Sequence, residues 1–251
     1  DFKILRSICE ASGNYTEEDL LVIRGISYDI AFAYQNYNGD LIQFFGSNPS
    51  GHPLTVIING LSNSIYQRYA YVICNPENEC TSFKTNVSLM TYGDDNIMGI
   101  SDETPWYNHT AISVALKSIG VVYTMADKEA ESVPYINISE ASFLKRTWRY
   151  DENTNTYLGP LEHDSIVKSL TTCVRSKSIT PEEQIMSIIA GANGEYFFYG
   201  KEIYEIKQKM FRDVIQKHNL NNYIADSTLP NYDYMLQRYF KQSALGIDSD
   251  N

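Results

Sequence analysis

The sequence predicts an α+β fold in which an antiparallel sheet packs with helices and a mainly helical region follows. Three observations lead to this prediction. Apolar residues recur at helical spacing in several segments, two short apolar runs flank turn residues between positions 87 and 100, and nearly every pattern after position 160 is helical. Hydrophobic residues make up 43% of the 251 residues, which is enough for a sizeable core.

Helices are expected where apolar residues recur three or four positions apart and capping residues stand at the ends. Thr16 and Asp19 resemble a capping box at the start of one helix. Pro53 suits a first helical turn, because an N–H at that position has no intrahelical partner. These patterns place helices at residues 2–12, 16–30, about 53–72, 109–118, 162–170, 181–190, 196–217 and 232–239.

Strands are expected where apolar runs flank turn residues. Residues 36–39 signal one hairpin and residues 92–96 signal a second, tighter one. The same criterion places strands at residues 31–34, 41–45, 87–91, 97–100, 121–124 and 140–148. We interpret residues 151–159 as a turn-rich link and residues 246–251 as a frayed acidic tail, and we place a domain boundary at residue 148.

Composition limits the possible functions. The net charge of −11 argues against a nucleic-acid binder, which usually carries a basic face. Lys145, Arg146 and Arg149 cluster in one short stretch, however, so the distribution of charge still permits RNA contact beside a basic partner segment. The four cysteines include no Cys-x-x-Cys pair and predict neither a zinc site nor a disulfide framework. No apolar run approaches the roughly 20 residues that span a membrane.

Two adjacent aspartates, Asp94 and Asp95, stand at the expected tip of the second hairpin. Aspartate pairs are common in ordinary turns, because their side chains bond their own backbone. Here apolar strand residues on both sides place the pair at the exposed end of a sheet. Two carboxylates repel each other unless a hard cation lies between them, and Mg²⁺ prefers few carboxylates, water and phosphates. Two such ions about 3.5–4 Å apart activate a 3′-hydroxyl and stabilise leaving pyrophosphate.

Four ordered motifs connect this hypothesis to a family. Tyr92-Gly93-Asp94-Asp95 resembles polymerase motif C, and Pro49–Thr55 with Asn59 resembles motif B upstream. Downstream, Met125–Lys128 resembles motif D and Phe143–Arg146 resembles motif E. The chain thus resembles the C-terminal palm and thumb of the RNA-dependent RNA polymerases of picorna-like viruses (Picornavirales). The stretch 46–53 is most similar to the algal-virus, marnavirus-like branch.

The resemblance implies a partial palm over residues 1–148 and a helical thumb over residues 149–251. It implies template-directed RNA synthesis in viral genome replication, by nucleotidyl transfer from a nucleoside triphosphate to an RNA 3′-hydroxyl. The implied cofactor is Mg²⁺, with Mn²⁺ as an alternative, and the implied partners are template RNA, primer RNA and nucleoside triphosphates. The implied site comprises Asp94 and Asp95 as metal ligands, Lys128 as general acid, Ser50 and Gly51 as the nucleotide-adjusting loop, Thr55 and Asn59 as ribose contacts, and Phe143, Leu144, Lys145 and Arg146 as the primer grip.

The sequence departs from the family pattern in two respects. Neither motif A nor the fingers is recognised, so we expect the chain to be inactive alone and to act with those segments of the same polyprotein. Gly60 stands where many relatives have serine. The resemblance also implies a location in the host cytoplasm, at viral replication complexes.

Other interpretations remain open from the residues alone. The chain could be a non-catalytic folded remnant or an RNA-contacting module, or part of another polymerase class such as a reverse transcriptase. The glycine before Asp94 and the Phe143–Arg146 stretch favour the RNA virus enzyme over a reverse transcriptase. Individually, Ser50-Gly51 could simply open a helix, Asn59 could be a buried polar residue, Lys128 could be solvated, and Phe143–Arg146 could be a plain amphipathic strand.

Overall fold

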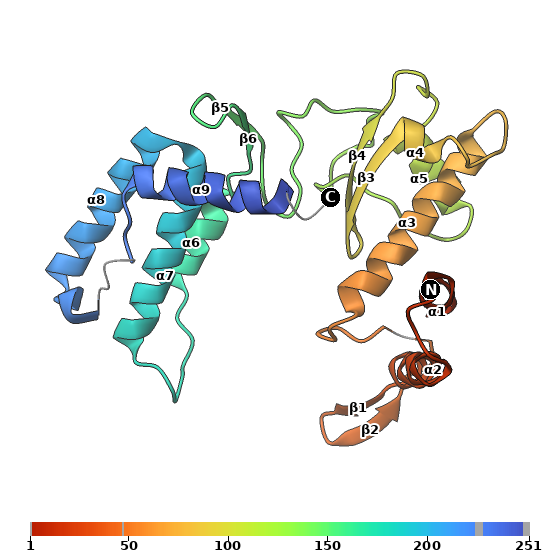
Figure 1. Ribbon diagram of the computed structural model, residues 1–251, viewed down its shortest axis with the longest axis horizontal. Helices are drawn as coiled ribbons and strands as arrows, with labels where there is room; N and C mark the ends of the chain where they lie inside the picture. The colour runs from red at the N-terminus through yellow and green to blue at the C-terminus, as the bar shows by residue number, and fades with distance from the viewer. Residues whose placement is uncertain (1, 47, 224–227, 248–251) are drawn as a thin grey trace. The chain divides into compact units, whose positions relative to one another are not determined.

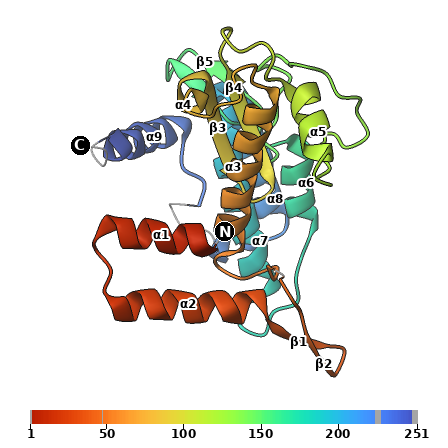
Figure 2. The same ribbon diagram turned by 90° about the vertical axis from the view of Figure 1, so that its right-hand side faces the viewer.

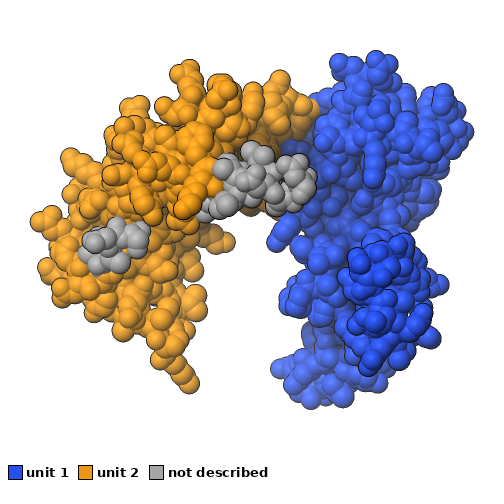
Figure 3. All heavy atoms as spheres, viewed as in Figure 1, with its two compact units in different colours: residues 1–135 blue, residues 136–251 orange. Residues whose placement is uncertain are grey.

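The computed structural model describes residues 2–46, 48–223 and 228–247. The chain (Figure 1) divides into two compact units, unit 1 (residues 1–135) and unit 2 (residues 136–251), which Figure 3 shows in different colours. Each unit has its own hydrophobic core. Helices and small antiparallel sheets occur in both, which confirms the predicted α+β class. The functional palm–thumb boundary at residue 148 is a different division and stays a prediction.

Unit 1 begins with two helices, α1 (Phe2–Ser12) and α2 (Glu17–Ala31), which lie side by side (Figure 2). The predicted capping box is confirmed at the start of α2. The Thr16 hydroxyl accepts a hydrogen bond from the Asp19 backbone N–H, and the Asp19 carboxylate accepts one from the Thr16 N–H at 2.8 Å. Two backbone donors that lack helical partners are thereby satisfied.

The first predicted hairpin is confirmed, with shifted bounds. It consists of β1 (Tyr34–Tyr37) and β2 (Asp40–Gln43), joined through Asn38 and Gly39 at positive φ values of 55° and 102°. Asn-Gly favours such a tight turn, because both residues tolerate the left-handed region. The strand predicted at 31–34 begins late because α2 continues through Ala31.

The core of unit 1 surrounds one long helix. Tyr71 of that helix packs edge-to-face against Phe83 and Tyr107, with ring centroids 5.2 Å and 5.1 Å away. The long helix contacts a hairpin and a short helix, which lie beside it in Figure 1. The elements are α3 (Thr55–Cys74), α4 (Phe83–Asn86), β3 (Val87–Tyr92), β4 (Asp95–Ile100) and α5 (His109–Lys117).

Unit 2 is mainly helical, as predicted. Its central helix contacts the helices before and after it, and a second capping box starts it, formed by Thr180 and Glu183. The elements are β5 (Arg149–Asp151), β6 (Thr156–Leu158), α6 (His163–Thr171), α7 (Pro181–Tyr196), η1 (Phe197–Tyr199), α8 (Lys201–Lys217), η2 (Leu220–Tyr223) and α9 (Tyr232–Ile247). None of the described helices combines the length and apolar character needed to cross a membrane.

Two predicted strands are wrong. Residues 121–124 form no strand, because Val121 N–H bonds back to Leu116 O and the Tyr123 carbonyl accepts from the Ser113 hydroxyl. Residues 140–148 form a turn with isolated bridges instead of a strand. Leu144 and Lys145 have φ values of 53° and 65°, which reverse the chain within that stretch.

Other expected bounds also change. The expected turn-rich link at 151–159 contains most of the β5–β6 hairpin. The helix expected at 196–217 is interrupted, because Gly200 has a φ of 94° and separates η1 from α8. Of the expected acidic tail, residues 248–251 lie outside the described residues, whereas α9 extends to Ile247.

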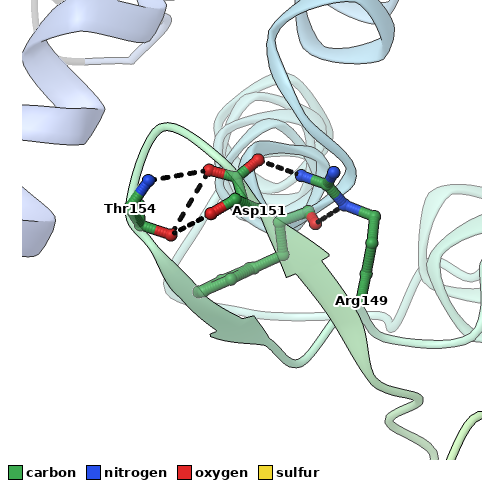
Figure 4. Close-up of polar contacts among 4 residues, drawn as sticks. Arg149, Asp151 and Thr154 are labelled. Carbon is green, nitrogen blue, oxygen red and sulfur yellow. Dashed lines mark hydrogen bonds and ion pairs between the residues drawn. The ribbon is translucent and has the colours of Figure 1, made fainter.

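A buried carboxylate holds the β5–β6 hairpin. Figure 4 shows Asp151, which is 2% exposed, bonded to the Arg149 guanidinium on one side and to the backbone N–H and hydroxyl of Thr154 on the other. Arg149 also donates from Nε to the carbonyl of Phe198, and its guanidinium lies against Gly200. The hairpin is thereby attached to the junction between η1 and α8.

Burial would raise the pKa of Asp151. The hydrogen bonds from Arg149 and Thr154, together with the guanidinium charge, outweigh burial and hold the pKa below its usual value. Because the pKa is lower in the folded chain than in the unfolded chain, ionised Asp151 stabilises the fold above pH of about 4. This contribution is lost as the pH falls through the folded-state pKa.

We predict that Asp151→Asn lowers the free energy of unfolding by about 1.5–3 kcal/mol at pH 7, because a buried charge-assisted bond is lost. The difference from the wild type should shrink as the pH falls below about 4. Urea unfolding followed by tryptophan fluorescence measures both effects. Asp213→Asn, at an exposed position on α8, is the matched control and should change stability by less than about 0.5 kcal/mol. Equal losses for the two variants would contradict the role of Asp151.

Candidate functional site

The paired aspartates lie at the tip of the β3–β4 hairpin. Tyr92 pairs with Asp95, so Gly93 and Asp94 form a two-residue turn. Gly93 has a φ of +62°, and a glycine at the first turn position is typical of a type II′ hairpin. Asp94 and Asp95 are both exposed, whereas Gly93 is buried. The predicted hairpin is confirmed, and its turn places two consecutive carboxylates at one exposed end.

Helix α3 packs directly behind this tip. A Cβ on Gly93 would lie 3.6 Å from Val56 Cγ2, and a Cβ on Gly60 would lie 3.3 Å from Thr91 Oγ1. Gly60 therefore allows close approach of the helix to β3, which gives a physical reason for glycine at this position. Val56 and Gly60 lie one helical turn apart on the face that meets the hairpin.

A buried polar network joins α3 to the tip. The Asn63 side-chain amide donates from Nδ2 to the carbonyls of Gly93, Asp94 and Asp95, at 3.3, 2.8 and 3.2 Å. Asn63 Oδ1 accepts from Gln67 Nε2 at 3.4 Å and from Asn96 Nδ2 at 3.1 Å. The network ends in two tyrosine hydroxyls: Tyr107 donates to Gln67 Oε1 at 3.0 Å, and Tyr123 donates to Asn96 Oδ1 at 2.8 Å.

Sequence reasoning missed Asn63. A signal was present: Asn59, Asn63 and Gln67 follow one another at intervals of four, which places three amides on one side of the helix. Asn63 and Gln67 are 6% and 1% exposed, so they face the interior. Buried amides need hydrogen-bond partners, and these two find them at the hairpin tip and in Tyr107.

The four motif B residues lie around the N-terminal end of α3. Ser50 and Gly51 form an exposed turn, and Gly51 has a φ of +81°. The Thr55 hydroxyl donates to the carbonyl of Pro49 at 2.6 Å. Asn59 Oδ1 accepts from Asn48 Nδ2 at 2.9 Å, while Asn48 Oδ1 is buried without a partner among the described residues. In this arrangement the Thr55 and Asn59 side chains bond to the loop that precedes α3. A ribose that bonds to the same side-chain atoms must therefore displace those contacts.

Lys128 lies in unit 1, exposed in a turn after the extended segment 121–125. Asp127 stabilises this turn by accepting from the Glu129 N–H at 3.1 Å. The extended segment before this turn is attached to the β3–β4 hairpin, because the Tyr123 hydroxyl donates to Asn96 Oδ1. The turn that carries Lys128 is thus connected to the hairpin that carries the aspartates.

The residues predicted to form a primer grip lie in unit 2. Phe143 and Arg146 exchange backbone hydrogen bonds of 2.9 and 3.0 Å, so Leu144 and Lys145 form the tip of a tight turn. Lys145 is largely exposed and lies 3.3 Å from Glu162. Arg146 forms two 2.9 Å bonds to the Glu195 carboxylate. The turn therefore presents Leu144 and Lys145 outward, whereas Arg146 attaches it to α7.

The donor set at the tip suits a magnesium ion. Over the described ranges, neither Asp94 nor Asp95 forms an ion pair with a basic side chain. No cluster of three or more potential metal ligands occurs among those residues either. Mg²⁺ is usually held by one or two carboxylates together with water and substrate phosphates. Two exposed carboxylates are therefore a suitable donor set, with further ligands to come from other groups.

Comparison with known proteins gives consistent results. A family model for viral RNA-dependent RNA polymerase matches residues 1–211. The chain is 31% identical over 207 residues to the replicase polyprotein of Cricket paralysis virus, covering 80% of the chain and 12% of the polyprotein. It is 33% identical over 182 residues to the RNA1 polyprotein of Raspberry ringspot virus, covering 70% of the chain and 8% of the polyprotein.

Solved polymerase structures include one with a similar fold. The Sicinivirus 3Dpol RNA dependent RNA polymerase superposes with a TM-score of 0.62 at 16% identity, covering 87% of this chain and 42% of that one. The chain therefore spans less than half of the solved polymerase and about an eighth of the first polyprotein.

We predict that Gly93→Ala destabilises unit 1 by about 1–2 kcal/mol, because a Cβ is strained at a positive φ. Gly99→Ala is the matched control in the same hairpin. Gly99 has no positive φ, and its added Cβ would meet only Ser88 Cβ at an ordinary 3.8 Å. Gly99→Ala should therefore be close to neutral. Thermal or urea unfolding measures the two changes, and similar values would argue against the strained turn.

Proposed function

Because the chain belongs to the viral RNA-dependent RNA polymerase family, we propose that it forms part of an enzyme that synthesises RNA on an RNA template. The predicted resemblance to the polymerases of picorna-like viruses is confirmed at the level of the family. The finer similarity to the algal-virus branch stays a prediction.

The observation that carries the proposal is the exposed Asp94–Asp95 pair on a hairpin backed by α3. A turn that needs two carboxylates only for its own geometry would bond them to nearby backbone N–H groups. Among the described residues, neither the Asp94 nor the Asp95 carboxylate forms such a bond, whereas the backbone carbonyls of both accept from Asn63. Both carboxylates are therefore available for a cation.

Asp94 would be the main magnesium ligand, and Asp95 its weaker neighbour. Bound Mg²⁺ would activate the RNA 3′-hydroxyl and neutralise the negative charge on the leaving pyrophosphate. The chain's own contribution is to hold the two carboxylates together at a rigid tip. Helix α3 and its buried amides supply that rigidity.

The remaining residues have proposed roles around the reacting groups. Lys128 would donate a proton to pyrophosphate, since a lysine ammonium is a competent general acid. Lys145 and Leu144 would contact the primer strand from the turn of unit 2. The nucleotide would be adjusted by Ser50 and Gly51 and its ribose read by Thr55 and Asn59, after the contacts to Pro49 and Asn48 open.

The proposed context is a larger polymerase polypeptide. Support comes from the relatives, because the chain spans 42% of the solved polymerase and 12% of the first polyprotein. Motif A and the fingers would then be supplied by other segments of that polypeptide. Template RNA, primer RNA and nucleoside triphosphates are the proposed partners, and the host cytoplasm at viral replication complexes is the proposed location.

We predict that Asp94→Asn reduces primer extension on an RNA template to background, in a polymerase polypeptide that includes this chain. An amide keeps the shape of the carboxylate but loses the charge that attracts Mg²⁺. Asp102→Asn, at an exposed turn after β4, is the control and should retain activity. Full activity of Asp94→Asn would favour the alternative of a non-catalytic, RNA-contacting module.

Lys128 can be tested for proton donation with two variants. Lys128→Leu should slow single-nucleotide addition by up to about 10²–10⁴-fold and leave nucleotide affinity largely unchanged. Lys128→Arg keeps the positive charge, but a guanidinium does not release its proton in proteins. It should therefore be slow as well. Rapid-quench kinetics separate rate from affinity, and a normal rate for Lys128→Arg would show that charge alone is required.

A further inference from the structure

We infer that Asn63 is the positioning residue of the proposed metal site. Its amide holds the backbone of the hairpin tip so that the Asp94 and Asp95 carboxylates project together. This inference deepens the proposed function and rests on it. The three carbonyls that Asn63 binds belong to the two proposed ligands and to the glycine before them, at 2.8, 3.2 and 3.3 Å.

The geometry of the peptide bond explains how the amide acts at a distance. A side-chain amide has two N–H donors, and here three carbonyls share them. Each peptide unit is planar, so the direction of its carbonyl restrains the two Cα atoms that it joins. Turning three consecutive carbonyls toward α3 thereby restrains the directions of the Asp94 and Asp95 side chains, which are both exposed.

The orientation of the Asn63 amide is itself determined by its neighbours. The Tyr107 hydroxyl shares its hydrogen between the Gln67 backbone carbonyl at 2.9 Å and Gln67 Oε1 at 3.0 Å, which leaves Gln67 Nε2 to donate to Asn63 Oδ1 at 3.4 Å. Tyr107 is fully buried and Gln67 is 1% exposed, so water does not compete for these bonds. The amide nitrogen of Asn63 consequently faces the tip.

A second series of hydrogen bonds reaches Asn63 from the β3–β4 hairpin. Asn96 donates to Asn63 Oδ1 at 3.1 Å and accepts from the Tyr123 hydroxyl at 2.8 Å. The Tyr123 backbone is held in turn by Ser113 of α5 at 3.1 Å. Asn63 therefore joins α3, the hairpin and the segment that leads to Lys128.

Packing alone does not account for this amide. An aliphatic side chain at position 63 could fill the space between α3 and the hairpin. It would leave three carbonyls without their donor, one in a buried bond and two in part-buried bonds. Carbonyls shielded from water turn toward other partners when a donor is lost. What the amide adds is the orientation of the tip backbone, on which the two carboxylates depend.

The inference is tested by Mn²⁺ titration of the full isotopically labelled chain, read from paramagnetic broadening of the amide signals of residues 94–96. Asn63→Leu should weaken Mn²⁺ binding by about 10-fold or more, which is a usual cost of losing a residue that orients metal ligands. Asn75→Leu is the matched control, because Asn75 is also 6% exposed and adjoins the same helix. It should leave Mn²⁺ affinity unchanged.

Tyr107→Phe is a second variant, which keeps the ring and removes only the hydroxyl that orients Gln67. It should also weaken Mn²⁺ binding, by a smaller factor than Asn63→Leu. If Asn63→Leu does not fold, Tyr107→Phe takes its place in the test.

A second readout is the metal dependence of primer extension in a polymerase that includes the chain. For Asn63→Leu the Mg²⁺ concentration for half-maximal activity should rise, and high Mg²⁺ should restore part of the rate. A merely structural role would reduce the folded fraction and hence the rate equally at all metal concentrations. Unchanged Mn²⁺ affinity in folded Asn63→Leu and Tyr107→Phe chains would overturn the inference while leaving the proposed function intact. Absence of Mn²⁺ binding in the wild type, together with full activity of Asp94→Asn, would refute both.

Discussion

The arrangement of unit 1 depends on the contact between α3 and the tip of the β3–β4 hairpin. Gly60 lets the helix approach β3 closely, and Asn63 binds three consecutive carbonyls there. Buried amides are costly unless every donor and acceptor is paired. A shift of the helix by one residue would remove the amide from the tip and leave it unpaired. The need to satisfy Asn63 and Gln67 therefore selects one register, and that register positions the Asp94–Asp95 pair.

The net negative charge of the chain is compatible with this family, because the placement of individual basic side chains matters more for RNA contact than the sum of charges. Three cations that composition suggests for RNA contact have internal partners in unit 2: Lys145 with Glu162, Arg146 with Glu195, and Arg149 with Asp151. Only Lys145 is largely exposed, and an exposed pair contributes little, so its ammonium can exchange partners readily. Arg146 and Arg149 instead attach short turns to the helices of unit 2. Clusters of basic residues in a sequence thus do not by themselves locate a nucleic-acid surface.

Much of the fold could be predicted because its signals are local. The capping box at Thr16, the turn at Asn38-Gly39 and the long helix α3 each depend on residues a few positions apart. The errors concern segments whose conformation depends on partners outside the segment. Residues 121–124 use their backbone groups to bind α5. Residues 140–148 turn back at Leu144 and Lys145, whose positive φ values their residue types do not favour, and the backbone groups of Lys145 and Thr147 bond to Glu162 and Pro160.

The sequence by itself determined the family and the carboxylate pair, because the motifs are short runs whose order along the chain is visible without a structure. It also determined that Asp94 and Asp95 stand at a tight turn, since glycine is suited to a positive φ. Only the tertiary structure decided what holds that turn. The bonds from Asn63 join residues about 30 positions apart, and no local pattern specifies which buried amide meets which carbonyl. Such pairings arise when helix and hairpin pack and must satisfy each other's polar groups away from water.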